Sequence, residues 1–98
     1  MLLADKHAVI ELMRRQFAVE LGEFGIRTVS LRRGGIPDTI PAEVDGADAI
    51  RASLRSSTLT GRCATPADIG NVAAFVASDR AASMTAATVN VSAGALID

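Results

Sequence analysis

The sequence contains few side chains that could carry out chemistry, and their isolation limits what that chemistry could be. Cys63 is the only cysteine, His7 is the only histidine, and the 98 residues include neither Tyr nor Trp. A lone thiol forms no disulfide within the chain, and a metal site or a cysteine nucleophile needs a partner such as histidine at motif spacing. We therefore expect no metal site, and we interpret Cys63 as a small, partly buried residue.

The segment from 32 to 43 is the part of the chain whose backbone could serve a ligand. It holds Gly34, Gly35 and two of the three prolines, so it should be an irregular loop, and such loops between regular elements often carry function. A glycine-rich connector with a tight turn at a proline is an equally good interpretation. Arg32 and Arg33 could contact a phosphate, but a solvated pair at a strand end is the simpler reading.

A long helix is predicted ahead of this loop, from Asp5 to Leu21. Asp5 is a suitable N-cap, and Gly22 should end the helix in the left-handed conformation. Glu11 and Arg14 have ion-pair spacing on this helix, which is worth about 0.2–0.5 kcal/mol rather than chemistry. Large apolar residues recur at spacings of three and four, which is typical of one helical stripe: Val9, Leu12, Met13, Phe17 and Leu21.

The remaining elements alternate strand and helix. Runs rich in β-branched residues predict strands at 26–31 and 87–91, and the stretch 42–56 is weakly helical. The sequence from Thr65 to Asp68 predicts a helix start, with Thr as the N-cap, Pro at the first position and an acidic side chain that caps back. A strand, a long crossover and a strand imply a right-handed parallel β-α-β unit. Two parallel strands leave unpaired edges, so an upstream sheet or a second copy should complete the structure.

Composition excludes several classes of protein. A chain of 98 residues with 49% hydrophobic residues is one domain at most, spanning 1–98. Its net charge of -1, with both signs mixed along the chain, argues against a nucleic-acid partner. No apolar run approaches the roughly 20 residues needed to cross a bilayer, and the start lacks the order of a signal peptide. We expect a cytoplasmic protein without a membrane partner.

The whole chain, in the correct order and at family spacing, resembles the C-terminal part of a short-chain dehydrogenase/reductase. Residues 6–22 resemble the helix that carries the family's catalytic lysine, and Gly25-Ile26-Arg27 resembles the start of its next strand. Gly34-Gly35-Ile36-Pro37-Asp38-Thr39 resembles the loop that lies against the nicotinamide in the family. Residues 61–69 resemble the segment before the last large helix, and 75–95 resemble the end of that helix and the final strand. The resemblance implies an α/β fold that is part of a Rossmann-like architecture.

The resemblance also implies a site, of which this chain carries only a part. Lys6 matches the lysine that lowers the pKa of a catalytic tyrosine and bonds the nicotinamide ribose, but Leu2 occupies the position of that tyrosine. The family's serine and its Gly-rich pyrophosphate-binding turn would precede Met1. The implied cofactor-binding residues are Lys6, Gly34, Gly35, Ile36 and Thr39. The loop departs from the family where Arg33-Gly34 replaces the usual Pro-Gly.

Three interpretations follow. In the first, the chain is a C-terminal fragment of an oxidoreductase that uses NAD or NADP on a carbonyl/alcohol pair, and alone it binds no cofactor and is inactive. In the second, it is a non-catalytic association module that forms a homo-oligomer, in particular a dimer, through the apolar faces of its helices. In the third, even the parent protein lacks the tyrosine and has lost or altered activity. Whether the chain is an enzyme is open at this stage.

Overall fold

A computed structural model of the protein describes residues 3–98, with side chains from residue 6 onward. Three helices, α1 (Leu3–Leu21), α2 (Ala47–Ser56) and α3 (Pro66–Ala77), accompany two strands, β1 (Val29–Arg32) and β2 (Ala87–Asn90). Short 3-10 turns occupy η1 (Gly22–Phe24), η2 (Pro37–Thr39) and η3 (Asp79–Ala81). The order of elements agrees with the prediction, and the fold is α/β.

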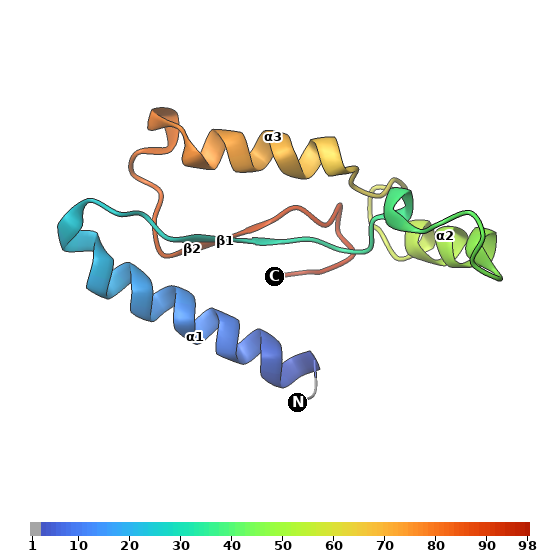
Figure 1. Ribbon diagram of the computed structural model, residues 1–98, viewed down its shortest axis with the longest axis horizontal. Coiled ribbons are helices and arrows are strands. Elements are labelled where there is room, and N and C mark those ends of the chain that lie inside the picture. The colour runs from blue at the N-terminus through green and yellow to red at the C-terminus, as the bar shows by residue number, and fades with distance from the viewer. Residues whose placement is uncertain (1–2) are drawn as a thin grey trace.

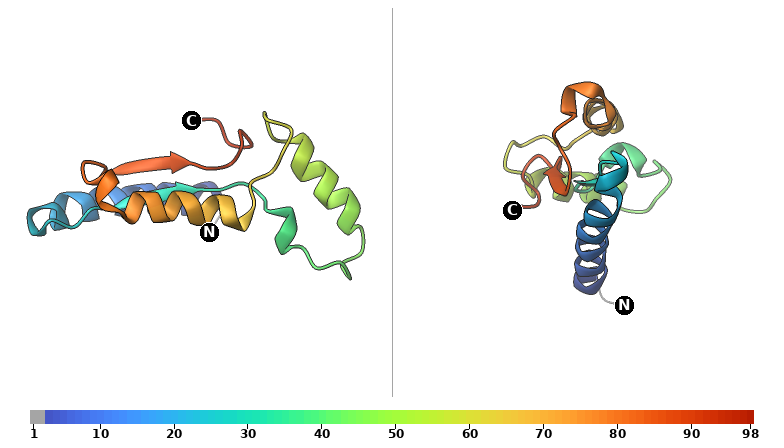
Figure 2. Two further views of the ribbon diagram at one scale, coloured as in Figure 1. Left: turned by 90° about the horizontal axis from the view of Figure 1, so that it is seen from above. Right: turned by 90° about the vertical axis from the view of Figure 1, so that its left-hand side faces the viewer.

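The two strands pair in parallel, as the sequence predicted, with Val29 opposite Ala87 and Arg32 opposite Asn90. α1 and α3 lie on opposite sides of this pair, and α2 projects at one end of the molecule (Figures 1 and 2). This arrangement covers both faces of the strands, which parallel sheets require. It is the arrangement of a partial Rossmann-like fold.

The first helix ends where it was predicted to end, but its start and the left-handed glycine that follows it differ from the prediction. It begins at Leu3 rather than at an N-cap on Asp5, so Asp5 lies inside the helix. It ends at Leu21, but the left-handed residue is Gly25 (φ 75°), whose N–H bonds the carbonyl of Gly22 at 3.0 Å. The reason is that a 3-10 turn continues the helix before the chain reverses, and the reversal needs the glycine.

The third helix begins as predicted. The Asp68 N–H donates to Thr65 Oγ1 at 3.1 Å, and the Thr65 N–H donates to Asp68 Oδ2 at 2.9 Å, which is a complete capping box. The weakly helical stretch contains α2, preceded by Gly46 in the left-handed conformation (φ 75°). The loop from 32 to 43 is less irregular than expected because Pro37 starts the turn η2.

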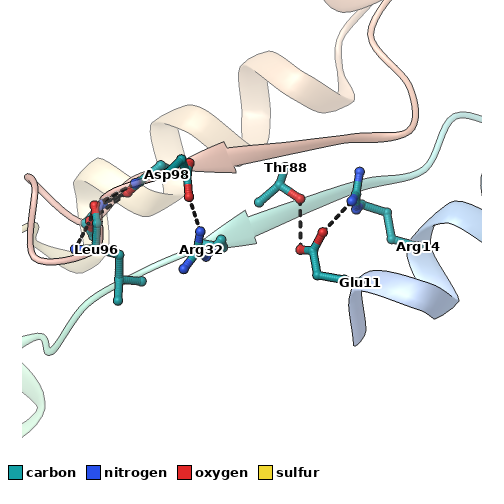
Figure 3. A network of polar contacts seen from close by, with 8 residues as sticks. Glu11, Arg14, Arg32, Thr88, Leu96 and Asp98 are labelled. Carbon is teal, nitrogen blue, oxygen red and sulfur yellow. Dashed lines mark hydrogen bonds and ion pairs between the residues drawn. The ribbon is translucent and has the colours of Figure 1, made fainter. Parts of the chain in front are cut away.

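α1 packs on the strands through polar groups rather than through its apolar stripe. Arg14 is only 8% exposed, and its guanidinium donates to the carbonyl oxygen of Ala86 and pairs with Glu11. Glu11 in turn accepts a hydrogen bond at 3.0 Å from the Thr88 hydroxyl on β2 (Figure 3). The predicted ion pair between Glu11 and Arg14 is therefore present, but Arg14 also reaches a carbonyl 72 residues away, which the spacing on the helix did not indicate.

The structure is extended and its core is small. The radius of gyration is 15.8 Å, whereas a compact chain of this length would have about 12.6 Å. The accessible surface is 6768 Å², roughly 1,500 Å² more than the roughly 5,300 Å² expected of a compact monomer of this mass. Among residues 6–98, the buried apolar side chains are mostly small: Ala18, Ile36, Ala47, Cys63 and Ala81. The fold therefore leaves much apolar surface uncovered.

Exposed apolar side chains on α1 form the largest part of that surface. Leu21 is half-buried, and the other four members of the predicted stripe are between 43% and 66% exposed: Val9, Leu12, Met13 and Phe17. A helix with apolar residues on several sides is usually buried on several sides. Within the described part of the chain, no helix is long and apolar enough to cross a bilayer.

Candidate functional site

The candidate site lies at the end of the molecule to which the carboxyl ends of β1 and β2 point. The N-terminal half of α1, which carries Lys6, lies toward this same end (Figure 1). In parallel α/β sheets the carboxyl ends of the strands are where ligands bind. Lys6 is exposed, and the ion pairs formed within residues 6–98 do not include it. Leu2, the position implied for tyrosine, lies outside the described residues.

The two glycines of the loop are in close contact with the protein itself. A Cβ on Gly35 would lie 2.3 Å from Leu54 Cδ2 on α2, and a Cβ on Gly34 would lie 3.1 Å from the Cβ of Ala95. The absence of side chains therefore lets α2 and the C-terminal tail approach the loop. In this structure the space that glycine provides is filled by neighbouring side chains.

Ile36 and Thr39 are also engaged within the chain. The Ile36 side chain is 8% exposed and belongs to the small core. The Thr39 hydroxyl donates at 2.7 Å to the carbonyl oxygen of Ile36, and the Thr39 N–H donates to the same oxygen at 3.0 Å. Thr39 keeps its hydroxyl lone pairs for a ligand, but its proton already has an acceptor.

The C-terminal tail folds back beside the loop and was not anticipated from the sequence. The Asn90 amide donates to the carbonyl oxygen of Leu96 at 2.8 Å, and the buried Ser92 hydroxyl donates to Asn90 Oδ1 at 2.6 Å. Arg32 forms an ion pair with Asp98 (Figure 3). The interpretation of Arg32 as a solvated residue was therefore wrong, whereas Arg33 is exposed as expected. The Asn-x-Ser spacing was the available signal, because both side chains often bond to nearby backbone.

Among the hollows on the surface of the described residues, two bear on the site. The larger, of about 480 Å³, lies between β1 and α3, away from the loop, and is lined by Gly25, Arg27, Val29, Leu31, Ala73, Val76 and Ala77. The smaller, of about 220 Å³, lies beside the loop and is lined by Pro37, Asp38, Arg55, Gly61, Arg62, Cys63, Ala64 and Thr65. Cys63 is buried, as expected. The part of the chain that the structure describes contains no cluster of three metal-binding side chains.

Two carboxyls among the described residues have a pKa below the usual value. Burial tends to raise the pKa of the Glu11 carboxyl, but hydrogen bonds from Arg14 and Thr88 hold the pKa below its usual value. Hydrogen bonds from the backbone and side chain of Thr65 lower the pKa of Asp68. Both carboxyls hold elements together, and neither has the raised pKa of a general acid.

Comparison with known proteins identifies the family. Residues 1–95 match the family described as enoyl-(acyl carrier protein) reductase. The NADH-dependent enoyl-[acyl-carrier-protein] reductase of Haemophilus influenzae is 31% identical over 87 residues, which are 89% of this chain and 33% of that protein. The chain therefore spans about a third of the length of its relatives.

Comparison with solved structures supports the same family. The angucycline C-6 ketoreductase LanV with bound NADP superposes with a TM-score of 0.79 at 27% identity, over 93% of this chain and 35% of that one. The enoyl-(acyl-carrier-protein) reductase of Anaplasma phagocytophilum, in complex with NAD, gives a TM-score of 0.76 at 25% identity, over 90% of this chain and 34% of that one. The chain belongs to the short-chain dehydrogenase/reductase family, and within it to the enoyl-(acyl carrier protein) reductase group, as the C-terminal part of that fold.

Proposed function

We propose that this chain supplies the lysine-bearing helix and the nicotinamide-side loop of an NAD(P)-dependent oxidoreductase. The observation that carries the proposal is that the N-terminal half of α1, which contains Lys6, and the loop that follows β1, which contains Gly34 and Gly35, lie toward the same end of a parallel strand pair (Figure 1). The similar ketoreductase holds NADP, and the similar enoyl reductase holds NAD. Both fit a nicotinamide cofactor in the complete protein, and we place that protein in the cytoplasm.

Alone, the 98-residue chain should bind neither NAD nor NADP and should not catalyse the reaction. Lys6 would contribute a positive charge that bonds a ribose hydroxyl and lowers the pKa of a nearby phenol, but the tyrosine position is Leu2. A leucine has no exchangeable proton, so general acid catalysis, worth about 10²- to 10⁴-fold in rate, has no donor there. A pyrophosphate needs several free backbone N–H groups at a helix N-terminus, and in the family these belong to a Gly-rich turn that comes earlier in the fold than the part matched by this chain.

The substrate of the complete protein is one of two classes. The relatives include a ketoreductase and enoyl reductases, so hydride transfer would go to a carbonyl carbon or to the β-carbon of an enoyl thioester. The family match over residues 1–95 favours the enoyl thioester as the first substrate to assay. A carbonyl/alcohol pair is the second.

Titration of the purified chain with NADH and NADPH, monitored by nicotinamide fluorescence, tests the proposal for the isolated chain. We expect no saturable binding to the 98-residue protein. Reading the DNA upstream of Met1 tests the remainder: an in-frame Gly-rich fingerprint followed by a serine would support a parent enzyme, and an immediate stop codon with an independent promoter would contradict it. In the longer protein, Leu2→Tyr should raise the rate if the missing phenol is limiting, and an unchanged rate would argue that the site works differently.

A second function is favoured by the exposed apolar stripe of α1. We propose that this stripe makes the chain a homo-oligomer, in particular a dimer, through helix-to-helix contact, because a monomer tolerates such a surface badly. Phe17 is 43% exposed in the middle of the stripe. Light scattering should show a dimer for the wild type and a smaller species for Phe17→Glu, with Glu23→Gln on the exposed turn η1 as the control. A folded wild-type monomer at micromolar concentration would contradict this function.

A further inference from the structure

Arg32, the last residue of β1, is bonded to both ends of the segment from Val91 to Asp98. Its carbonyl oxygen accepts a hydrogen bond from the Val91 N–H at 2.7 Å, and its guanidinium forms an ion pair with the Asp98 carboxylate (Figure 3). One residue therefore closes residues 91–98 into a ring. A segment held at both ends has lost more conformational freedom than a segment held at one end.

Hydrogen bonds inside the ring fix its shape. The Leu96 N–H donates to the Ser92 hydroxyl oxygen at 3.0 Å, and that hydroxyl donates to Asn90 Oδ1 at 2.6 Å. The Asn90 amide donates in turn to the carbonyl oxygen of Leu96 at 2.8 Å. Because these bonds already order the segment, the ion pair at its end has to immobilise only two side chains.

The ring contacts the loop that follows β1. Gly34 lies two positions after Arg32, and a Cβ on Gly34 would be 3.1 Å from the Cβ of Ala95 and 3.6 Å from the Cβ of Ser92. The Gly34 Cα therefore lies directly against the ring. Where the loop begins its path away from the strand depends on whether the ring is closed.

The Asp98 carboxylate is the partner of the Arg32 guanidinium among residues 6–98. The Arg32 side chain is 23% exposed, and its Nε is buried without a hydrogen-bond partner in that part of the chain. A cation so far removed from water needs its counter-charge. The Asp98 side chain is 48% exposed, so dissolved salt reaches the pair and weakens it. The ion pair is thus the contact at which the ring can open.

We infer that Arg32 is a positioning residue for the loop from Gly34 to Thr39, which it holds against the ring through its ion pair with Asp98. When the pair opens, the end of the ring is released, Ala95 moves away from Gly34 and the loop loosens. A partly exposed ion pair changes the ratio of closed to open ring by up to about fivefold. The consequence for a nicotinamide cofactor rests on the proposed function, whereas the positioning of the loop does not.

The experiment is NMR on the purified 98-residue protein. It measures the nuclear Overhauser effect between the Ala95 methyl group and the Gly34 Hα atoms, together with the exchange rate of the Leu96 amide. In Asp98→Ala the cross-peak should weaken and the Leu96 amide should exchange up to about fivefold faster. Asp98→Glu keeps the charge and should retain most of both signals. Asp45→Ala is the matched control, because Asp45 is exposed and outside the ion pairs of residues 6–98, and it should change neither signal.

A charge exchange separates positioning from a general loss of stability. Arg32→Glu should open the ring, because two carboxylates then face each other, and the double variant Arg32→Glu with Asp98→Arg should restore the cross-peak. In the unmodified protein, about 1 M sodium chloride should weaken the cross-peak by screening the pair. The same salt should have no further effect in Asp98→Ala. The Asp68 amide, which is bonded to Thr65 in the capping box, should stay protected throughout and shows that each sample is folded.

An unchanged cross-peak and an unchanged Leu96 exchange rate in a folded Asp98→Ala sample would overturn the inference, since the ion pair would then be a surface contact without effect on the loop. A charge exchange that leaves the cross-peak weak would also overturn it. The salt titration uses the unmodified protein and does not depend on whether any variant folds. Saturable binding of NADH by the isolated chain would contradict the proposed function and would leave this inference intact.

Discussion

Gly94 lies directly against Leu59, so that a Cβ on Gly94 would be 2.5 Å from the Cβ of Leu59. The Leu59 N–H also bonds the carbonyl oxygen of Ala93 at 3.0 Å. The turn after β2 is thus joined to the connection between α2 and α3. This contact brings the C-terminal tail next to the loop at Gly34.

Gly94→Ala should destabilise the protein by about 2–3 kcal/mol, because the residue has φ 86° and the new methyl group meets a Cβ rather than a flexible side-chain end. The measurement is the urea midpoint followed by circular dichroism. Gly70→Ala is the control, since Gly70 is in α3 with nothing within 4 Å of its Cβ position, and it should be neutral or stabilise by about 1 kcal/mol. If the two substitutions changed the urea midpoint equally, the close contact between Gly94 and Leu59 would be contradicted.

The elements that the sequence predicted well are those determined by local chemistry. Thr65, Pro66 and Asp68 form the capping box at the expected place, because a cap needs only neighbouring residues. The parallel pairing was also predicted, since strand order and crossover length restrict it. The end of α1 at Leu21 was predicted correctly, but the left-handed glycine is Gly25 rather than Gly22, because the 3-10 turn η1 intervenes before the chain reverses.

The capping box provides a second prediction. Thr65→Ala removes the acceptor for the Asp68 N–H and should lower the free energy of unfolding by about 1 kcal/mol. Ser83→Ala is a suitable control because Ser83 is exposed. Thr65→Ser keeps the hydroxyl and should retain most of the stability in the same urea titration. If Thr65→Ser were as destabilising as Thr65→Ala, the methyl group rather than the cap would be responsible.

Acid should weaken the attachment of α1 to β2. The pKa of Glu11 in the folded protein is below its ordinary value of 4.5, so the carboxylate stabilises the fold fully above about pH 4.5, and this contribution disappears as the pH falls through the lower folded pKa. Glu11→Gln should therefore reduce the difference between the urea midpoints at pH 7 and pH 3. Glu23→Gln, on the exposed turn η1, should leave that difference unchanged. If Glu23→Gln reduced the difference as much as Glu11→Gln, the loss of stability in acid could not be assigned to Glu11.

The site could be predicted less completely than the fold, for a physical reason. The family resemblance indicated Lys6 and the glycines of the loop, but which surface each glycine faces depends on distant residues. Leu54 lies 19 positions from Gly35, and Ala95 lies 61 positions from Gly34. Sequence patterns carry no information about such long-range contacts. The contact of Arg14 with the carbonyl of Ala86 was missed for the same reason. The spacing of Arg14 and Glu11 on one helix can be read from the sequence, whereas a hydrogen bond to a residue 72 positions away cannot.

Arg14→Met should therefore destabilise the protein far more than its place on a mostly exposed helix suggests. The substitution keeps the length of an apolar stem but leaves the Glu11 carboxylate without its cation and the carbonyl of Ala86 without this donor, which should lower the free energy of unfolding by about 2 kcal/mol. Arg15→Met, one position further along and exposed, is the matched control and should change stability by less than about 0.5 kcal/mol. Tryptophan is missing from the chain, so the urea transition is best followed by circular dichroism. In the double variant Arg14→Met with Glu11→Gln, part of the loss should be recovered because the unpaired charge is gone; strictly additive losses would show that Arg14 acts through Ala86 alone.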